Sequence, residues 1–147
     1  MTLEQALVKP NPVAEIAVRL SHKATSSMTE PEKVFWSVSY FAGDTLNGGL
    51  EQSLTNDTGE LVPVFAEFAK RYGSPELVAV VEQIVALFPS GQLPADREER
   101  YRLISEADPA QLDRLTKAFY GCEAAIDKGL IALATKNHAQ FNLTSET

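Results

Sequence analysis

Apolar residues recur along this chain three or four positions apart, which is the spacing of amphipathic α-helices. The most hydrophobic stretch follows Ser74-Pro75, and we expect it to be a central helix. Its apolar stripe consists of Leu77, Val80, Val81, Ile84, Val85 and Phe88. No convincing run of alternating apolar and polar residues occurs, so the pattern predicts no sheet.

Short polar residues that can accept hydrogen bonds from a first helical turn mark the helix starts. Thr29-Glu30-Pro31-Glu32 has the form of a capping box with a proline early in the helix. Similar acidic caps are predicted at Asp57, Asp96 and Asp108, and Gly73 stands where a left-handed glycine would end a helix. We therefore expect an all-α fold, an orthogonal bundle of six to seven helices.

The length of 147 residues suits a single helical domain that spans 1–147. Its core is expected at about 29–105 and is followed by a long C-terminal helix at about 109–136. Gly121 is a point at which that last helix can bend. Residues after Asn137 are expected to fray, as chain ends commonly do.

The chain departs from ordinary helical patterning at one place, a Gly-Gly pair surrounded by carboxamides and carboxylates. Glycine inside a helix costs about 1 kcal/mol, so a helix should end near Asn47 and one or two further turns should follow over 50–54. We call the segment from Asp44 to Gly59 the corner. Its candidate site residues are Asp44, Asn47, Gly48, Gly49, Gln52, Asn56 and Gly59.

Two interpretations of the corner remain open. Its carboxylates and amides could line a polar pocket for a small ligand or for acid–base chemistry. A tight corner between helices also needs glycines for close approach and amide side chains for the backbone groups that the turn frees. The architectural interpretation is the stronger one, because polar corner residues usually serve as caps. No catalytic residue is assigned.

Acidic residues are in excess, with 20 aspartates and glutamates against 13 lysines and arginines and a net charge of −7. Most of the excess lies between Val34 and Asp96, where the only bases are Lys70 and Arg71. Such a segment repels nucleic acid and anionic membranes and attracts a basic partner, although solubility is the simpler explanation. The candidate acidic interaction surface consists of Glu51, Asp57, Glu60, Glu67, Glu76, Glu82 and Asp96.

Residue types that bind metals or act as nucleophiles are sparse. The two histidines, His22 and His138, lie near opposite ends of the chain, and the single cysteine, Cys122, falls on an apolar stripe. The sequence therefore predicts no metal site and no cofactor, and a buried Cys122. We expect a cytoplasmic protein, because the sequence has one cysteine and shows neither a membrane-spanning stretch nor a signal peptide.

The corner also carries a family resemblance. The order Asn47-Gly48-Gly49, Gln52, Asn56, Gly59, with Asp44 before it, is similar to the pattern of a family of small bacterial helical proteins that includes a neisserial DNA-mimic protein. A later run, from Phe88-Pro89 through Pro94 to Asp96, Arg97 and Arg100, resembles the family's proline-rich loop and charged helix start. The resemblance extends over about 32–101. Leu46, Leu50 and Ser53 depart from it, because an asparagine and aromatics are common there.

The resemblance implies an all-helical fold, suggests a homodimer, and for the best-understood member implies binding of a DNA-binding regulator in place of DNA. The leading hypothesis is a non-enzymatic acidic domain that binds a basic protein and makes no direct contact with nucleic acid or membrane. One alternative is a small-ligand or enzymatic site at Asn47-Gly48-Gly49. Another is a toxin-neutralising accessory protein.

Overall fold

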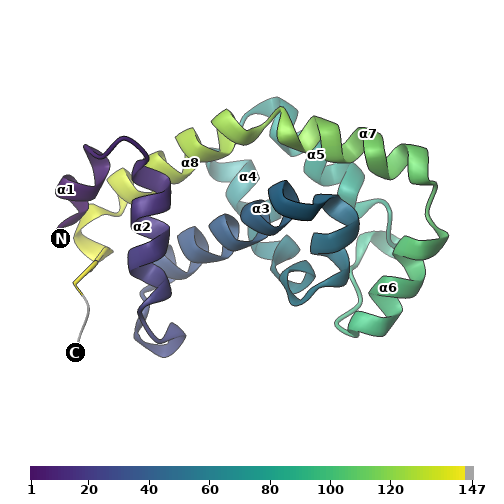
Figure 1. Ribbon diagram of the computed structural model, residues 1–147, viewed down its shortest axis with the longest axis horizontal. Coiled ribbons are helices and arrows are strands. Elements are labelled where there is room, and N and C mark those ends of the chain that lie inside the picture. Colours follow the sequence, from purple (N-terminus) through teal and green to yellow (C-terminus); the bar gives the residue numbers. More distant parts are fainter. Residues whose placement is uncertain (145–147) are drawn as a thin grey trace.

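The computed structural model describes residues 1–144, and over that range the chain folds entirely into helices without any strand (Figure 1). The predicted all-α fold is confirmed, and the described residues form eight α-helices where six to seven helices were expected. They are α1 (Leu3–Leu7), α2 (Pro12–Ser21), α3 (Glu30–Thr55), α4 (Val62–Tyr72), α5 (Pro75–Val85), α6 (Arg97–Glu106), α7 (Pro109–Tyr120) and α8 (Glu123–Lys136). Short 3₁₀ turns are η1 (Thr25–Ser27), η2 (Asp57–Leu61), η3 (Pro89–Gly91) and η4 (His138–Gln140).

The central element is α3, which crosses the middle of the molecule in Figure 1 and contacts α2, α4, α6, α7 and α8. The sequence pattern pointed instead to α5, which packs against α4 and α7. Phe41 of α3 meets Phe65 of α4 and Phe119 of α7, with ring centroids 5.2 and 5.9 Å apart. Burying such aromatic rings stabilises the fold most where several helices converge, and that point lies on α3.

Most predicted helix starts are confirmed by their capping bonds. Thr29 and Glu32 form the reciprocal capping box at the start of α3, and the Ser74 hydroxyl accepts from the Leu77 amide at 3.2 Å. The carboxylates of Asp96 and Asp108 cap α6 and α7. These contacts span only two or three residues, so the local sequence specifies them.

Two predicted helix boundaries are wrong, the start of α4 at Asp57 and the left-handed conformation at its end, Gly73. Asp57 does not cap α4: it lies in η2, and α4 begins at Val62 without a side-chain cap. Gly73 ends α4 in an extended conformation (φ −88°, ψ 175°) instead of a left-handed one. A Cβ atom at Gly73 would lie 2.6 Å from the Ala69 carbonyl oxygen, so the position requires glycine for close approach.

The C-terminal part differs from its prediction in two ways. The expected long helix is divided into α7 and α8 by Gly121 and Cys122. Residues 138–144 do not fray, because Phe141 and Leu143 are buried in the core and the Asn142 amide donates to the buried Glu32 carboxylate at 2.6 Å. Only 145–147 of the segment expected to fray lie outside the described residues.

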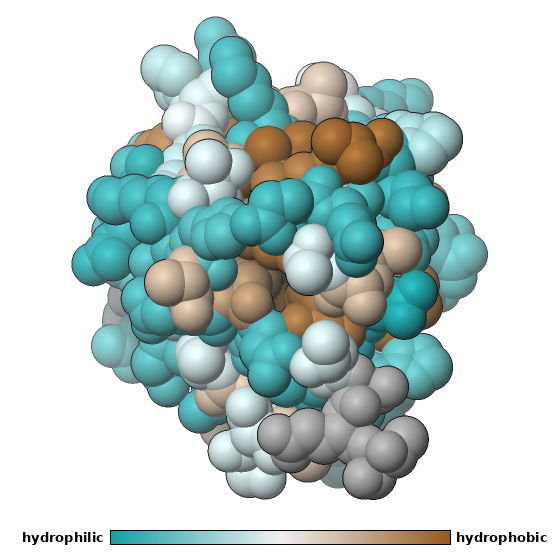
Figure 2. Space-filling view, turned by 90° about the vertical axis from the view of Figure 1, so that its left-hand side faces the viewer, coloured by the Kyte–Doolittle hydropathy of each residue, from teal (hydrophilic) through white to brown (hydrophobic). Residues whose placement is uncertain are grey.

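The surface is predominantly polar on the face shown in Figure 2, where apolar side chains emerge between hydrophilic ones. Exposed apolar side chains in the N-terminal part include Val8 and Val18. Within residues 1–144, no helix combines the length and the apolar character that crossing a bilayer requires.

Candidate functional site

The corner is built on a break inside α3. Gly49 has φ +80° and ψ 176°, a backbone conformation that is essentially restricted to glycine. The next amide, that of Leu50, donates to the Thr116 hydroxyl of α7 at 3.2 Å. The predicted helix end near Asn47 and the short helical stretch after it are therefore confirmed, and the break packs against α7.

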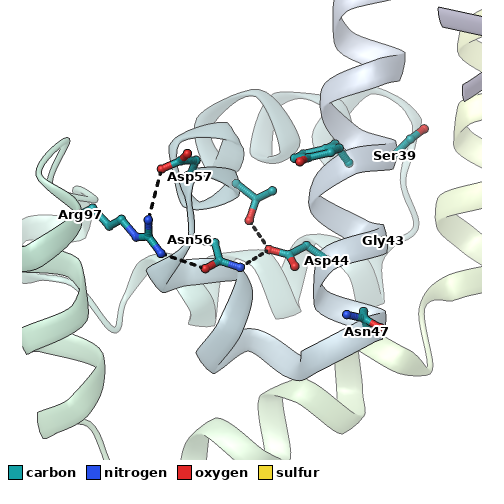
Figure 3. Close-up of a pocket in the computed structure, with 9 residues that line it drawn as sticks. Ser39, Gly43, Asp44, Asn47, Asn56, Asp57 and Arg97 are labelled. Carbon is teal, nitrogen blue, oxygen red and sulfur yellow. Dashed lines mark hydrogen bonds and ion pairs between the residues drawn. The ribbon is translucent and has the colours of Figure 1, made fainter. Parts of the chain in front are cut away.

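The Asp44 carboxylate lies at the centre of the corner and accepts three side-chain hydrogen bonds, of which Figure 3 shows the two from Asn56 and Thr58. Oδ1 accepts from Gln52 Nε2 at 2.7 Å, which spans the break. Oδ2 accepts from Asn56 Nδ2 at 3.2 Å and from the Thr58 hydroxyl at 2.6 Å. One carboxylate thus joins the first part of α3, its last turns and η2.

These bonds set the charge of Asp44. Partial burial by itself would raise its pKa, but the hydrogen bonds from Thr58, Gln52 and Asn56 together outweigh burial and lower the pKa below its usual value. Asp44 is therefore a carboxylate at neutral pH with most of its acceptor positions occupied. A general acid or base needs a pKa near the working pH, and the pKa of Asp44 is shifted away from it.

The remaining corner residues have different surroundings. A side chain on Gly48 would collide with Gln52, and one on Gly59 would approach the Leu54 carbonyl oxygen to 2.6 Å. Asn47 is exposed and makes no side-chain hydrogen bond within residues 1–144. The structure therefore brings together Asp44, Gln52 and Asn56, packs both glycines closely, and leaves Asn47 at the surface.

Two arginines, Arg97 and Arg100, complete the corner, and neither was among its predicted site residues. Arg97 donates to the Thr55 carbonyl at 2.9 Å and to the Asn56 side chain at 3.3 Å. Arg100 is fully buried, and its guanidinium donates to four backbone carbonyls. These belong to Leu54 and Asn56 at 3.0 Å, Pro94 at 2.9 Å and Ala95 at 3.0 Å. In the sequence, both arginines belong to the run that resembles the family's charged helix start, and this was the signal that could have identified them.

Arg100 has no carboxylate within ion-pair distance in residues 1–144. Its charge is balanced by carbonyl dipoles, two of them where the last turn of α3 leads into η2. The end of a helix carries partial negative charge, so this position suits a cation. Arg100 thereby fixes α6 and the proline-containing loop against the corner.

Two open clefts flank the corner. The first, which we call the Tyr40 cleft, has a volume of about 460 Å³. It is lined by Ser39, Tyr40, Gly43, Asp44, Asn47, Asn56, Asp57, Thr58 and Arg97 (Figure 3). The second, the Gly48 cleft, lies on the α6 side and is lined by Gly48, Glu51, Gln52, Thr55, Tyr101, Ile104 and Ser105.

The candidate acidic surface is exposed at every position. These residues are Glu51, Asp57, Glu60, Glu67, Glu76, Glu82 and Asp96. Asp57 lies 4.0 Å from Arg97, Glu67 lies 3.5 Å from Lys70, and Asp96 caps α6. Within residues 1–144 the other four have no ion-pair partner: Glu51, Glu60, Glu76 and Glu82.

These acids do not form one compact row. Glu51, Glu67 and Glu82 line three different surface grooves. The fold also places Arg97 beside Asp57, although Arg97 follows the acidic segment in sequence. A partner that contacts many of these carboxylates must extend over several helices.

The residues considered for metal binding and nucleophilic chemistry are scattered. Within the described part of the chain, no group of three or more His, Cys, Asp and Glu side chains is placed to hold a metal ion. His138 pairs with Glu4, and His22 is exposed elsewhere. Cys122 is buried as predicted, and burial, followed by the nearby Glu76 charge, raises the pKa of its thiol. A raised pKa disfavours the nucleophilic thiolate.

Comparison with known proteins gives one match. A family model described as "DMP19-like protein" matches residues 26–138 of the chain. No curated protein and no solved structure matches it. The family match confirms the resemblance that the corner motif indicated.

Proposed function

Because the chain belongs to the DMP19-like family, we propose that it is a non-enzymatic acidic protein that binds a basic, DNA-binding regulator in place of DNA. The partner would recognise carboxylates where it otherwise recognises phosphates. The protein itself would contact neither nucleic acid nor membrane, since both carry the same sign of charge. A cytoplasmic location suits such a partner and a chain with one cysteine.

The observation that carries this proposal is the exposure of the acidic side chains together with the lack of ion pairs at Glu51, Glu60, Glu76 and Glu82 in residues 1–144. A carboxylate that already has a cationic neighbour offers little to a partner. A free, solvated carboxylate contributes to long-range attraction and to the rate of encounter. A symmetric dimer, which we also propose, would double the number of such groups on one assembly.

The corner supports the non-enzymatic part of the proposal. Its carboxylate is occupied by three donors, and its pKa is lowered, so it is poorly suited to proton transfer. The interaction surface is consequently sought on the exposed carboxylates of α3, η2, α4 and α5 and not on Asp44 itself.

The proposal is tested by capture from a lysate of the source cell with the immobilised full chain. Wild-type protein is compared with a variant that carries Glu51→Gln, Glu60→Gln, Glu76→Gln and Glu82→Gln. A matched control neutralises four acids outside this surface, Glu98, Glu106, Asp113 and Glu123, so the net charge is the same. Captured proteins are identified and then challenged with added salt and with duplex DNA.

We expect wild type and the matched control to retain the same DNA-binding protein, and the quadruple variant to retain much less. Salt should release that protein, because exposed charges are screened over about 10 Å at 0.1 M ionic strength. Duplex DNA should displace it, since the two ligands use one surface. Retention of no basic protein at low salt, or equal retention by both four-site variants, would contradict the proposal.

A further inference from the structure

The Tyr40 cleft presents a fixed aromatic surface to solvent. Tyr40 is 54 % exposed although it stands on the central helix α3. Its ring stacks on Trp36 of the preceding turn, with centroids 5.1 Å apart and planes inclined by 13°. The stack supports the Tyr40 ring from one side and restricts its motion. The ring is thereby prepared for a ligand without a large loss of conformational entropy on binding.

The same cleft contains two carboxylates and one arginine. Asp44 is held by three hydrogen bonds and contributes a fixed negative charge. The Asp57 side chain is 87 % exposed, and its contact with Arg97 is long, at 4.0 Å. An exposed ion pair of that length is worth little, so another cation can compete for Asp57. The excess of negative charge disfavours a phosphate or another anion.

We propose that the Tyr40 cleft receives an arginine side chain of a protein partner. Its guanidinium would lie over the Tyr40 ring and donate hydrogen bonds to the Asp57 carboxylate, with the Asn47 side-chain oxygen as a further acceptor. A guanidinium is planar, stacks on aromatic rings and pairs with a carboxylate through two parallel bonds, whereas an ammonium is a compact, strongly hydrated charge. This assignment rests on the proposed function in one respect, the basic character of the partner.

The test uses small probes on the whole protein, so it does not depend on knowing the partner. Ethylguanidinium chloride and ethylammonium chloride are titrated at constant ionic strength, and the backbone and side-chain amide signals are followed by NMR. We expect saturable shifts around Tyr40, Asn47 and Asn56 with ethylguanidinium, and weaker, non-saturating shifts with ethylammonium.

Variants locate the effect. Tyr40→Ala and Asp57→Asn should each weaken ethylguanidinium binding by about two- to fivefold, in line with exposed cation–π and ion-pair interactions. The double variant should weaken it by roughly tenfold. The matched controls are Tyr101→Ala, an exposed tyrosine in the Gly48 cleft, and Asp113→Asn, an exposed aspartate paired with Lys117. Both controls should bind as wild type does.

Shifts that do not saturate, equal responses to the two probes, or unchanged binding by the double variant would each overturn the arginine assignment. These outcomes are separate from those of the capture experiment. If the wild-type protein captures no basic protein but binds ethylguanidinium, the proposed function is contradicted and the cleft assignment stands. If wild type and the Tyr40→Ala/Asp57→Asn variant capture the same DNA-binding protein equally well, and wild type does not bind ethylguanidinium, the cleft assignment is overturned and the proposed function stands.

Discussion

The Gln52 side-chain amide donates a hydrogen bond of 2.7 Å to the Asp44 carboxylate, and this bond bridges the break of α3 at Gly49. Asp44 precedes the break and Gln52 follows it. With the bonds from Asn56 and Thr58, the carboxylate holds the last turns of α3 and η2 against the first part of α3. Asp44, Gln52, Asn56 and Thr58 hydrogen-bond to one another, which makes this part of the corner a determinant of the fold.

Replacing Asp44 with asparagine should destabilise the protein. Asp44→Asn removes the charge from a group that accepts three hydrogen bonds and places an NH₂ group among donors. We expect the free energy of unfolding to fall by about 1–3 kcal/mol, as measured by urea denaturation. Glu51→Gln, an exposed carboxylate on the same helix, serves as control and should change it by less than about 0.5 kcal/mol. Equal effects of the two variants would refute a structural role for Asp44.

The stability contributed by Asp44 should depend on pH in acid. Its pKa in the folded state lies below the unfolded value of about 3.9, so its contribution is present above that value and is lost as the pH falls through the folded pKa. The pKa values of Glu4 and Glu99 are also lowered, by a backbone hydrogen bond and by Arg102. We therefore compare wild type with Asp44→Asn between pH 6 and 2. The difference in unfolding free energy should shrink toward pH 2, whereas parallel curves would contradict the prediction.

Two glycines of α3 should respond in opposite ways to alanine. Gly49→Ala forces a Cβ into a positive-φ conformation and against Thr116, and should cost about 1–3 kcal/mol. Gly43→Ala places a Cβ where nothing lies within 4 Å, inside a regular helical turn, and should add about 0.5–1 kcal/mol. Thermal unfolding of both variants measures this difference. A loss of stability in Gly43→Ala comparable to that in Gly49→Ala would show that the break is not the cause.

Removing the buried guanidinium should loosen α6. Arg100→Met leaves the Leu54 carbonyl without its guanidinium donor, and an unpaired buried acceptor costs roughly 1–3 kcal/mol. The Asn56 carbonyl loses one of two donors and keeps the Gly59 amide at 3.0 Å. We expect a total loss of about 2–4 kcal/mol and faster amide hydrogen exchange in α6 and the preceding loop. Arg114→Met, on the exposed face of α7, is the control and should leave both unchanged. Unaltered exchange in α6 would mean that Arg100 does not anchor it.

Local signals predicted the helix starts. Thr29, Ser74, Asp96 and Asp108 all cap helices as expected, because a cap involves residues only two or three positions apart. Asp57 and Gly73 resemble such signals but serve other roles, in η2 and in a close helix contact. A motif read in isolation does not reveal which of its possible partners lies nearby.

Contacts between residues far apart in the chain could not be predicted from the spacing of residues in the sequence. The tail was expected to fray, but the buried Glu32 binds both Lys23 at 2.8 Å and the Asn142 amide. Arg100 belongs to a charged helix with little apolar character, yet it is fully buried because four carbonyls converge on it. No spacing in the sequence specifies such convergence.

By itself, the sequence determined the all-helical class, most helix starts, the break at the Gly-Gly pair and the family, because each depends on residues close together in the chain. Only the tertiary structure decided that Asp44 is held by its neighbours, that Arg100 is buried, and that the acids of α3, α4 and α5 line separate grooves. Packing sets those facts, since it fixes which distant groups meet and which remain in water.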